Sequence, residues 1–173
     1  MQMGFSFDLS RCSGCMACVV ACMDQNDIAD DGRSFREVVK VERGAYPSAE
    51  IFSVSLACFH CSDAPCMIVC PKGAISRNTD WGVVEVNRDL CIGCRASAMV
   101  CPFGAPQFPP GEKMTKCNFC IGRVDHGMEP ACVRTCTTRA LGFGPIEELS
   151  RKRAEKASLR ILGAFIAAGQ EMK

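Results

Sequence analysis

Fifteen cysteines recur along the chain in four groups of nearly regular spacing. The groups are Cys12, Cys15, Cys18 and Cys22; Cys58, Cys61, Cys66 and Cys70; Cys91, Cys94 and Cys101; and Cys117, Cys120, Cys132 and Cys136. Repetition of this kind is an internal repeat. Thiols at this density indicate covalent or coordination chemistry, which leaves disulfide bonds, zinc sites and iron–sulfur clusters as the alternatives.

The spacing within the groups favours iron–sulfur clusters. The first group reads C-x2-C-x2-C-x3-C, in which one loop supplies three thiolates to a cluster and the last cysteine serves the other cluster of a pair. The second and fourth groups are looser variants, C-x2-C-x4-C-x3-C-P and C-x2-C-x11-C-x3-C. A tetrahedral zinc site instead uses two separated C-x2-C halves. The odd number of cysteines, and the absence of an export signal in the opening MQMGFSFDLSRCSGC, argue against a disulfide scaffold.

The third group departs from the pattern because it reads C-x2-C-x2-S-x3-C-P, with Ser97 at the place of a thiolate. A deprotonated serine oxygen can bind iron, but it binds less readily than a thiolate does. The alternative, which we favour, is loss of that iron, which leaves a three-iron cluster. Either outcome would change the reduction potential, since ligand identity is one of its main determinants.

Several regular elements are expected around these groups. Residues 38–44 (VVKVERG) and 51–57 (IFSVSLA) predict a β-hairpin, and residues 81–86 (WGVVEV) predict a short strand after a turn. Ser10 or Ser13 is expected to cap a short helix that carries Cys18 and Cys22 on one face. A helix is expected after Pro145, with acidic residues in its first turn. Its apolar stripe is expected to pack on the protein's own body, the alternative being another subunit; the stripe is Leu159, Leu162 and Ile166.

Several segments resemble one family of redox proteins. Residues 70–75 (CPKGAI), VEVNRDLCIGC and VCPFGAP are similar to a bacterial two-cluster ferredoxin, and CFHCSDAPC and KCNFC are further family-like pieces. Over residues 7–143 the chain resembles the four-cluster ferredoxin-type subunit of molybdenum or tungsten oxidoreductases. That family includes the iron–sulfur subunits of dimethyl sulfoxide, polysulfide and nitrate reductases, formate dehydrogenases and tungsten aldehyde oxidoreductases.

The resemblance implies an α+β fold of two ferredoxin-like modules, one inserted in the other, with a β-hairpin and a C-terminal helix. The outer module would comprise residues 1–57 and 107–145, the inserted module residues 58–106, and the helix residues 146–173. The resemblance also implies three [4Fe-4S] clusters and a fourth cluster that is [3Fe-4S] or serine-ligated [4Fe-4S]. The implied ligands are Cys12, Cys15, Cys18 and Cys136 for cluster 1; Cys22, Cys117, Cys120 and Cys132 for cluster 2; Cys58, Cys61, Cys66 and Cys101 for cluster 3; and Cys70, Cys91, Cys94 and Ser97 for cluster 4.

Two basic residues lie beside these cysteines. His60 could donate an N–H to a cluster sulfur, but packing beside the cluster is the favoured interpretation. Lys116 could place a positive charge near a cluster, but an exposed side chain is the favoured interpretation.

Other function classes have little support. A net charge of +1 argues against a general nucleic-acid binder. The apolar run at residues 161–168 is much shorter than the ~20 residues of a membrane helix. Nucleotide-binding motifs are absent, and two histidines with no convergent acid and base groups make a poor active site.

We therefore expect a non-catalytic electron-transfer subunit that works between a molybdenum or tungsten catalytic subunit and an acceptor. The acceptor would be a flavin subunit, a ferredoxin or a quinone-side partner. One alternative is a free soluble polyferredoxin, and another is an enzyme that uses an open iron site near Ser97. Co-purification and the activity of the isolated chain distinguish the three. The expected location is the cytoplasm, unless a partner that carries an export signal takes the chain with it.

Overall fold

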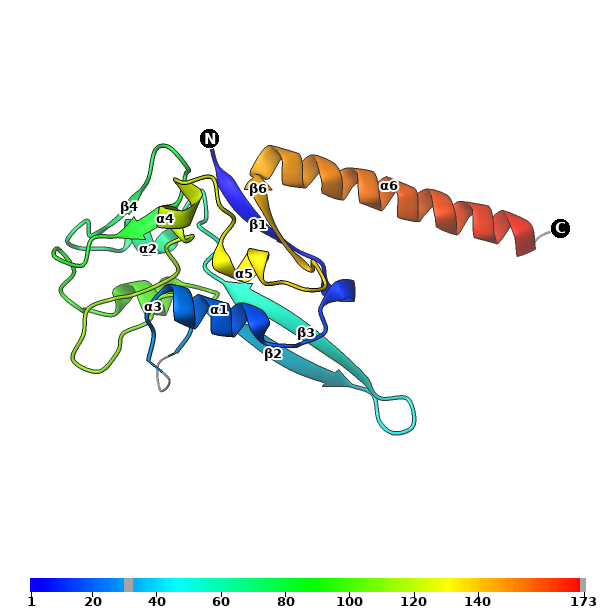
Figure 1. The fold of residues 1–173 in the computed structure, drawn as a ribbon, viewed down its shortest axis with the longest axis horizontal. Coiled ribbons are helices and arrows are strands. Elements are labelled where there is room, and N and C mark those ends of the chain that lie inside the picture. Colours follow the sequence, from blue (N-terminus) through cyan, green and yellow to red (C-terminus); the bar gives the residue numbers. More distant parts are fainter. Residues whose placement is uncertain (30–32, 172–173) are drawn as a thin grey trace.

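The computed structural model describes residues 1–29 and 33–171 and has a mixed helix-and-strand fold, as the α+β prediction states (Figure 1). Within the described residues, the strands form three separate antiparallel pairs. The pairs are β1 (Met3–Phe7) with β6 (Leu141–Pro145), β2 (Arg36–Arg43) with β3 (Glu50–Ala57), and β4 (Ile75–Arg77) with β5 (Val84–Val86). The helices are the 3-10 helix η1 (Leu9–Arg11), α1 (Ala17–Gln25), α2 (Pro65–Ile68), α3 (Ala96–Val100), α4 (Ile121–Val124), α5 (Ala131–Arg134) and α6 (Ile146–Glu171).

The β2–β3 pair is the predicted hairpin, and it projects from the body as a long ribbon (Figure 1). The strand predicted at residues 81–86 is shorter than expected, because β5 begins only at Val84. The Asn78 carboxamide oxygen accepts the backbone N–H groups of Asp80 and Trp81 at 2.9 and 3.1 Å. These bonds, and a left-handed Gly82 with φ +66°, hold the preceding residues in a turn.

The β1–β6 pair joins segments from near the two ends of the chain and was not predicted. It contributes Phe5 and Phe143, which face each other in the register, to a core around Phe119. Phe119 is fully buried, and its ring centroid lies 4.5 Å from that of Phe5 and 5.6 Å from that of Phe143. This core ties the Cys117–Cys120 segment to both ends of the chain.

Helix α1 carries Cys18 and Cys22 as predicted, and both are buried. The predicted serine cap is wrong, because α1 begins after Met16, which is left-handed (φ 63°) and makes no side-chain capping bond. Ser10 instead lies in η1, where its backbone N–H and its hydroxyl both donate to the Asp8 carboxylate.

Helix α6 confirms the predicted C-terminal helix, but the prediction that its apolar stripe packs on the body is wrong. The stripe side chains of Leu159, Leu162 and Ile166 are 65, 55 and 52% exposed. The helix contacts β1 and β6 near its start, and the last ion pair to the body joins Lys156 to Asp8 among the described residues. Beyond that point α6 projects past the rest of the fold and packs on none of the other described elements (Figure 1). Among the described helices, none combines the length and the apolar character that crossing a membrane requires.

Candidate iron–sulfur cluster sites

The loops of the first and third cysteine groups have the same backbone conformation. The residue before the second cysteine is a glycine in the left-handed region, Gly14 or Gly93, each with φ +68°. The residue after that cysteine, Met16 or Arg95, is also left-handed, with φ 63° in both loops. Non-glycine residues rarely adopt this conformation. The recurrence of the same two left-handed positions therefore indicates that the two loops are shaped to bind the same kind of group.

A second repeated feature places the third member of every group. Each of these residues is the second residue of a short or regular helix, and Ser97 is one of them. They are Cys18 in α1, Cys66 in α2, Ser97 in α3 and Cys132 in α5. Ser97 is therefore structurally equivalent to three cysteines that the spacing predicts to be ligands.

The first and fourth groups are brought together by the packing of α1 on α5. Burial raises the pKa of the Cys18 thiol, and the nearby thiols of Cys132 and Cys136 raise it further. Burial likewise raises the pKa of Cys120, with further contributions from Cys132 and Cys22. The last cysteine of each group thus lies beside the early cysteines of the other group.

The second and third groups are brought together by the packing of α2 on α3. Burial raises the pKa of Cys58, and the nearby thiols of Cys101 and Cys61 raise it further. Burial also raises the pKa of Cys66, followed by the effects of Cys58 and Cys101. Cys101 therefore lies with the first three cysteines of the second group.

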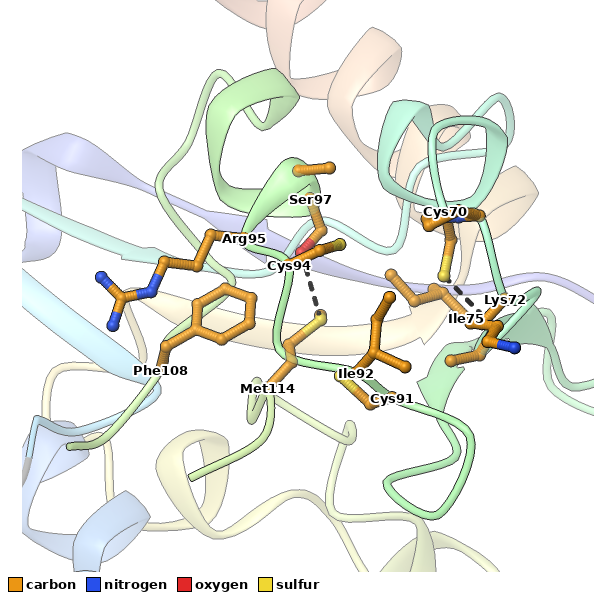
Figure 2. A pocket seen from close by; sticks show the side chains of 13 residues that line it. Cys70, Lys72, Ile75, Cys91, Ile92, Cys94, Arg95, Ser97, Phe108 and Met114 are labelled. Atoms are coloured by element: carbon orange, nitrogen blue, oxygen red, sulfur yellow. Dashed lines mark hydrogen bonds between the residues drawn. The ribbon is translucent and has the colours of Figure 1, made fainter. Parts of the chain in front are cut away.

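The remaining residues of these two groups line one pocket that is partly open to solvent (Figure 2). Its polar lining includes Cys70, Cys91, Cys94 and Ser97. The backbone N–H of Ala74 donates to the Cys70 sulfur at 3.3 Å. The hydroxyl of Ser97, which is 6% exposed, donates to the sulfur of Met114 at 3.3 Å (Figure 2).

The chemistry of these thiols fits a metal cluster. Burial raises the pKa of Cys117 to about 12, although the backbone N–H of Phe119 donates to its sulfur at 3.4 Å. A thiol in this environment becomes a thiolate when a metal cation binds it. Within the described residues, no three His, Cys, Asp or Glu side chains converge as the ligands of a single metal ion would.

Lys116 contradicts the prediction of an exposed side chain, because only 4% of it is exposed. Its ammonium group donates to the carbonyl oxygens of Val84 and Cys117, the latter at 2.9 Å. It forms no ion pair with a carboxylate among the described residues. The burial of a cation without an acidic partner is costly, so an anionic group nearby would stabilise it.

His60 is buried as well, at 1% exposure. The backbone N–H of Val84 donates to its Nδ1 at 3.1 Å, and its ring packs edge-to-face with Phe119 at 5.0 Å between centroids. Burial lowers the pKa of His60 to about 3, and the charge of Lys116 contributes further. The imidazole is therefore neutral, and it packs beside the second cysteine group as predicted.

Two family models match the chain, each described as a 4Fe-4S dicluster domain. One matches residues 49–146 and the other residues 11–75. Both spans contain the second cysteine group, and together they extend over all four.

The names of similar proteins agree with the domain matches. The chain is 42% identical over 167 residues to the B subunit of anaerobic dimethyl sulfoxide reductase of Escherichia coli, a match that covers 91% of this chain and 80% of that protein. It is 44% identical over 168 residues to YnfG, named as a probable anaerobic dimethyl sulfoxide reductase subunit of the same organism, with the same coverage. It is 36% identical over 167 residues to the protein NrfC of Escherichia coli, covering 92% of this chain and 74% of that protein. The chain therefore belongs to the 4Fe-4S dicluster family of iron–sulfur electron-transfer subunits that includes the B subunit of anaerobic dimethyl sulfoxide reductase.

Proposed function

We propose that the chain holds four clusters and conducts electrons between a molybdenum or tungsten catalytic subunit and a second redox partner. The observation that carries this proposal is the fourfold repeat in which the third group member is the second residue of a helix. The ligand sets are Cys12, Cys15, Cys18 and Cys136; Cys22, Cys117, Cys120 and Cys132; Cys58, Cys61, Cys66 and Cys101; and Cys70, Cys91 and Cys94 beside Ser97. When bound, such clusters accept and release single electrons, so the protein supplies ligands, spacing and insulation.

The fourth cluster is proposed to be [3Fe-4S]. The Ser97 hydroxyl donates a hydrogen bond, through its proton, to the Met114 sulfur at 3.3 Å, which gives it a partner within the protein. Binding iron as an alkoxide would require both the loss of that proton and the loss of the hydrogen bond. The serine-ligated [4Fe-4S] cluster is the alternative that this bond disfavours.

The modules are proposed to be nested, with residues 58–106 inserted between residues 1–57 and 107–145. The packing of α1 on α5 and the pairing of β1 with β6 support an outer module built from both ends of the chain. The β4–β5 pair and the contact of α2 with α3 lie wholly within the inserted segment. The core of the inserted module also includes Met114 and Phe108. The first residues of the returning part of the outer module therefore pack against the inserted module.

A stable place in a larger assembly is favoured over a free polyferredoxin. Helix α6 presents a long exposed apolar stripe, which a freely diffusing carrier would leave in water. The relatives at 42 and 44% identity bear names that describe one subunit of a reductase. The acceptor is proposed to be a flavin subunit, a ferredoxin or a quinone-side partner.

The test is anaerobic purification of the full chain through a tag, followed by identification and metal analysis of whatever co-purifies. The proposal expects a large subunit that contains molybdenum or tungsten, in a fixed ratio to this chain. A variant with Leu159, Leu162 and Ile166 changed to glutamine is the matched control for the part that α6 plays in the complex. Recovery of the unaltered chain as a monomer with its clusters intact would contradict the proposal and favour the polyferredoxin.

A further inference from the structure

Two side-chain nitrogens are buried without a hydrogen-bond partner among the described residues. They are Nε of Arg36 and Nε2 of His60. A buried polar group left unpaired is costly, so native proteins almost always provide a partner. Both residues lie beside cysteines of the proposed ligand sets, which suggests that the missing partner is part of a cluster.

The hydrogen bonds of His60 determine which ring nitrogen carries the proton. Nδ1 accepts the backbone N–H of Val84 at 3.1 Å, so Nδ1 bears no proton. The proton of the neutral ring is therefore on Nε2, which makes that atom a donor. The backbone N–H of His60 is itself a donor to the Cys58 sulfur, so the residue lies directly against the second cysteine group.

Arg36, the first residue of β2, is 3% exposed and held on two sides. One terminal nitrogen, Nη1, donates to the Ser55 hydroxyl at 3.1 Å, and the guanidinium carbon lies 4.8 Å from the centre of the Phe5 ring. Burial raises the pKa of the Cys132 thiol, whereas the charge of the guanidinium and a hydrogen bond from it lower that pKa. The charge also lowers the pKa of Cys18, without a hydrogen bond from Arg36. Nε–H is always protonated, so this atom can act only as a donor.

The surroundings of both donors favour an anionic acceptor. Arg36 has no carboxylate partner among the described residues, and the buried ammonium group of Lys116 close to His60 has none there either. Thiolate-bound clusters are anionic and carry sulfur acceptors. One cluster beside each donor would therefore satisfy the unpaired N–H and compensate the buried cation.

We propose that Arg36 donates Nε–H to a sulfur of the cluster held by Cys22, Cys117, Cys120 and Cys132, and that His60 donates Nε2–H to a sulfur of the cluster held by Cys58, Cys61, Cys66 and Cys101. Each hydrogen bond raises the reduction potential of its own cluster, because reduction adds negative charge to the sulfurs that accept it. This inference rests on the proposed ligand sets. It assigns different tuning residues to two neighbouring clusters.

The test is a potentiometric titration of the purified complex, with each cluster followed by its electron paramagnetic resonance signal. His60→Phe keeps an aromatic ring but removes the donor, and Arg36→Met removes both the donor and the charge. His60→Phe is expected to lower the reduction potential only of the cluster proposed to accept the His60 hydrogen bond, and Arg36→Met only that of the cluster proposed to accept the Arg36 hydrogen bond. The expected change is at least tenfold in the oxidised-to-reduced ratio at a fixed potential, which is about 59 mV for one electron. Each variant thereby serves as the control for the other.

Conservative variants separate hydrogen bonding from simple loss of packing. His60→Gln returns an N–H to the region of Nε2 and is expected to keep the potential near that of the unaltered protein. Arg36→Lys retains the charge and is expected to shift the potential less than Arg36→Met does. Unchanged potentials in His60→Phe and Arg36→Met, or equal shifts of every cluster in both, would overturn the inference.

A second measurement does not depend on whether the variants assemble. The chain contains two histidines, and His126 is exposed and bonded to the Gly122 carbonyl oxygen. Histidine labelled with ¹⁵N is expected to show a weak magnetic coupling to one reduced cluster of the unaltered protein, and absence of that coupling would overturn the role of His60. Iron content distinguishes the two levels of failure: a full iron complement without the coupling refutes this inference alone, whereas too few irons refute the ligand sets.

Discussion

Ser97→Cys is expected to convert the fourth cluster from [3Fe-4S] to [4Fe-4S]. Ser97 is buried as the second residue of α3, the position that Cys18, Cys66 and Cys132 hold in their helices. A cysteine there needs no backbone change, so the gain should be about one iron per chain. The oxidised three-iron cluster gives a resonance signal that an oxidised four-iron cluster lacks, and that signal should disappear.

The hydrogen bond from Ser97 to Met114 sets the size of a second, smaller effect. A hydrogen bond of this kind contributes about 0.5–1.5 kcal/mol, which is a factor of about two to thirteen in an equilibrium. Met114→Leu removes the acceptor while keeping an apolar side chain of similar size. The ratio of four-iron to three-iron forms should therefore rise by no more than that factor, whereas Ser97→Cys should make the conversion complete.

The assay is the intensity of the oxidised resonance signal together with iron content, measured in parallel for the unaltered chain and both variants. If the unaltered chain shows no three-iron signal, and Ser97→Cys changes neither signal nor iron content, Ser97 is not the site of a missing ligand. Conversion of the cluster by Met114→Leu as fully as by Ser97→Cys would show that the missing thiolate at position 97 does not determine the cluster type.

Three further predictions concern packing and the backbone. Phe119→Ala should lower the free energy of unfolding by about 3–5 kcal/mol in a denaturant titration. Phe59→Ala, which truncates a half-exposed ring, should lower it by about 0.5–1.5 kcal/mol. Equal losses would refute the role given to the core around Phe119. Gly14→Ala should accelerate cluster loss more than Gly93→Ala does, although φ is +68° at both positions. An added Cβ at Gly14 would lie 2.4 Å from the Ser53 hydroxyl oxygen, whereas a Cβ at Gly93 would meet nothing within 4 Å. Faster cluster loss in Gly93→Ala would refute this prediction. A hydrogen bond from Lys156 holds the pKa of Asp8 well below its usual range, so this ion pair should stabilise α6 above pH ~4 and be lost in stronger acid. At neutral pH, Asp8→Asn should therefore speed amide hydrogen exchange in the first turns of α6, and an unchanged exchange rate would contradict this role of the ion pair.

The parts of the fold that could be predicted are those set by local pattern. Cysteine spacing indicated the four groups, the two β-rich runs indicated the hairpin of β2 and β3, and Pro145 indicated the start of α6. The pairing of β1 with β6 could not be found in this way, because both strands are short, both contain glycine, and they lie far apart in the sequence. No local signal records that those two segments meet.

The environment of single residues was harder to predict than the elements that carry them. Lys116 reads as a surface residue by type, and its burial depends on carbonyl oxygens from Val84 and Cys117, which come from different segments. Burial of Arg36 likewise depends on Phe5 and Ser55. The apolar stripe of α6 was predicted to be buried and is exposed. An amphipathic pattern indicates that a helix needs a partner, but it does not indicate whether the same chain provides that partner.

The proposed function requires that this chain hold four clusters, one of them short by a thiolate. Quantification of iron and inorganic sulfide in the anaerobically purified protein, combined with spin counting of the oxidised and reduced signals, tests it most directly. We expect about fifteen irons and about sixteen sulfides per chain, with one three-iron signal in the oxidised protein and three further clusters on reduction. Fewer than about eleven irons, or fewer than four separable clusters, would contradict it.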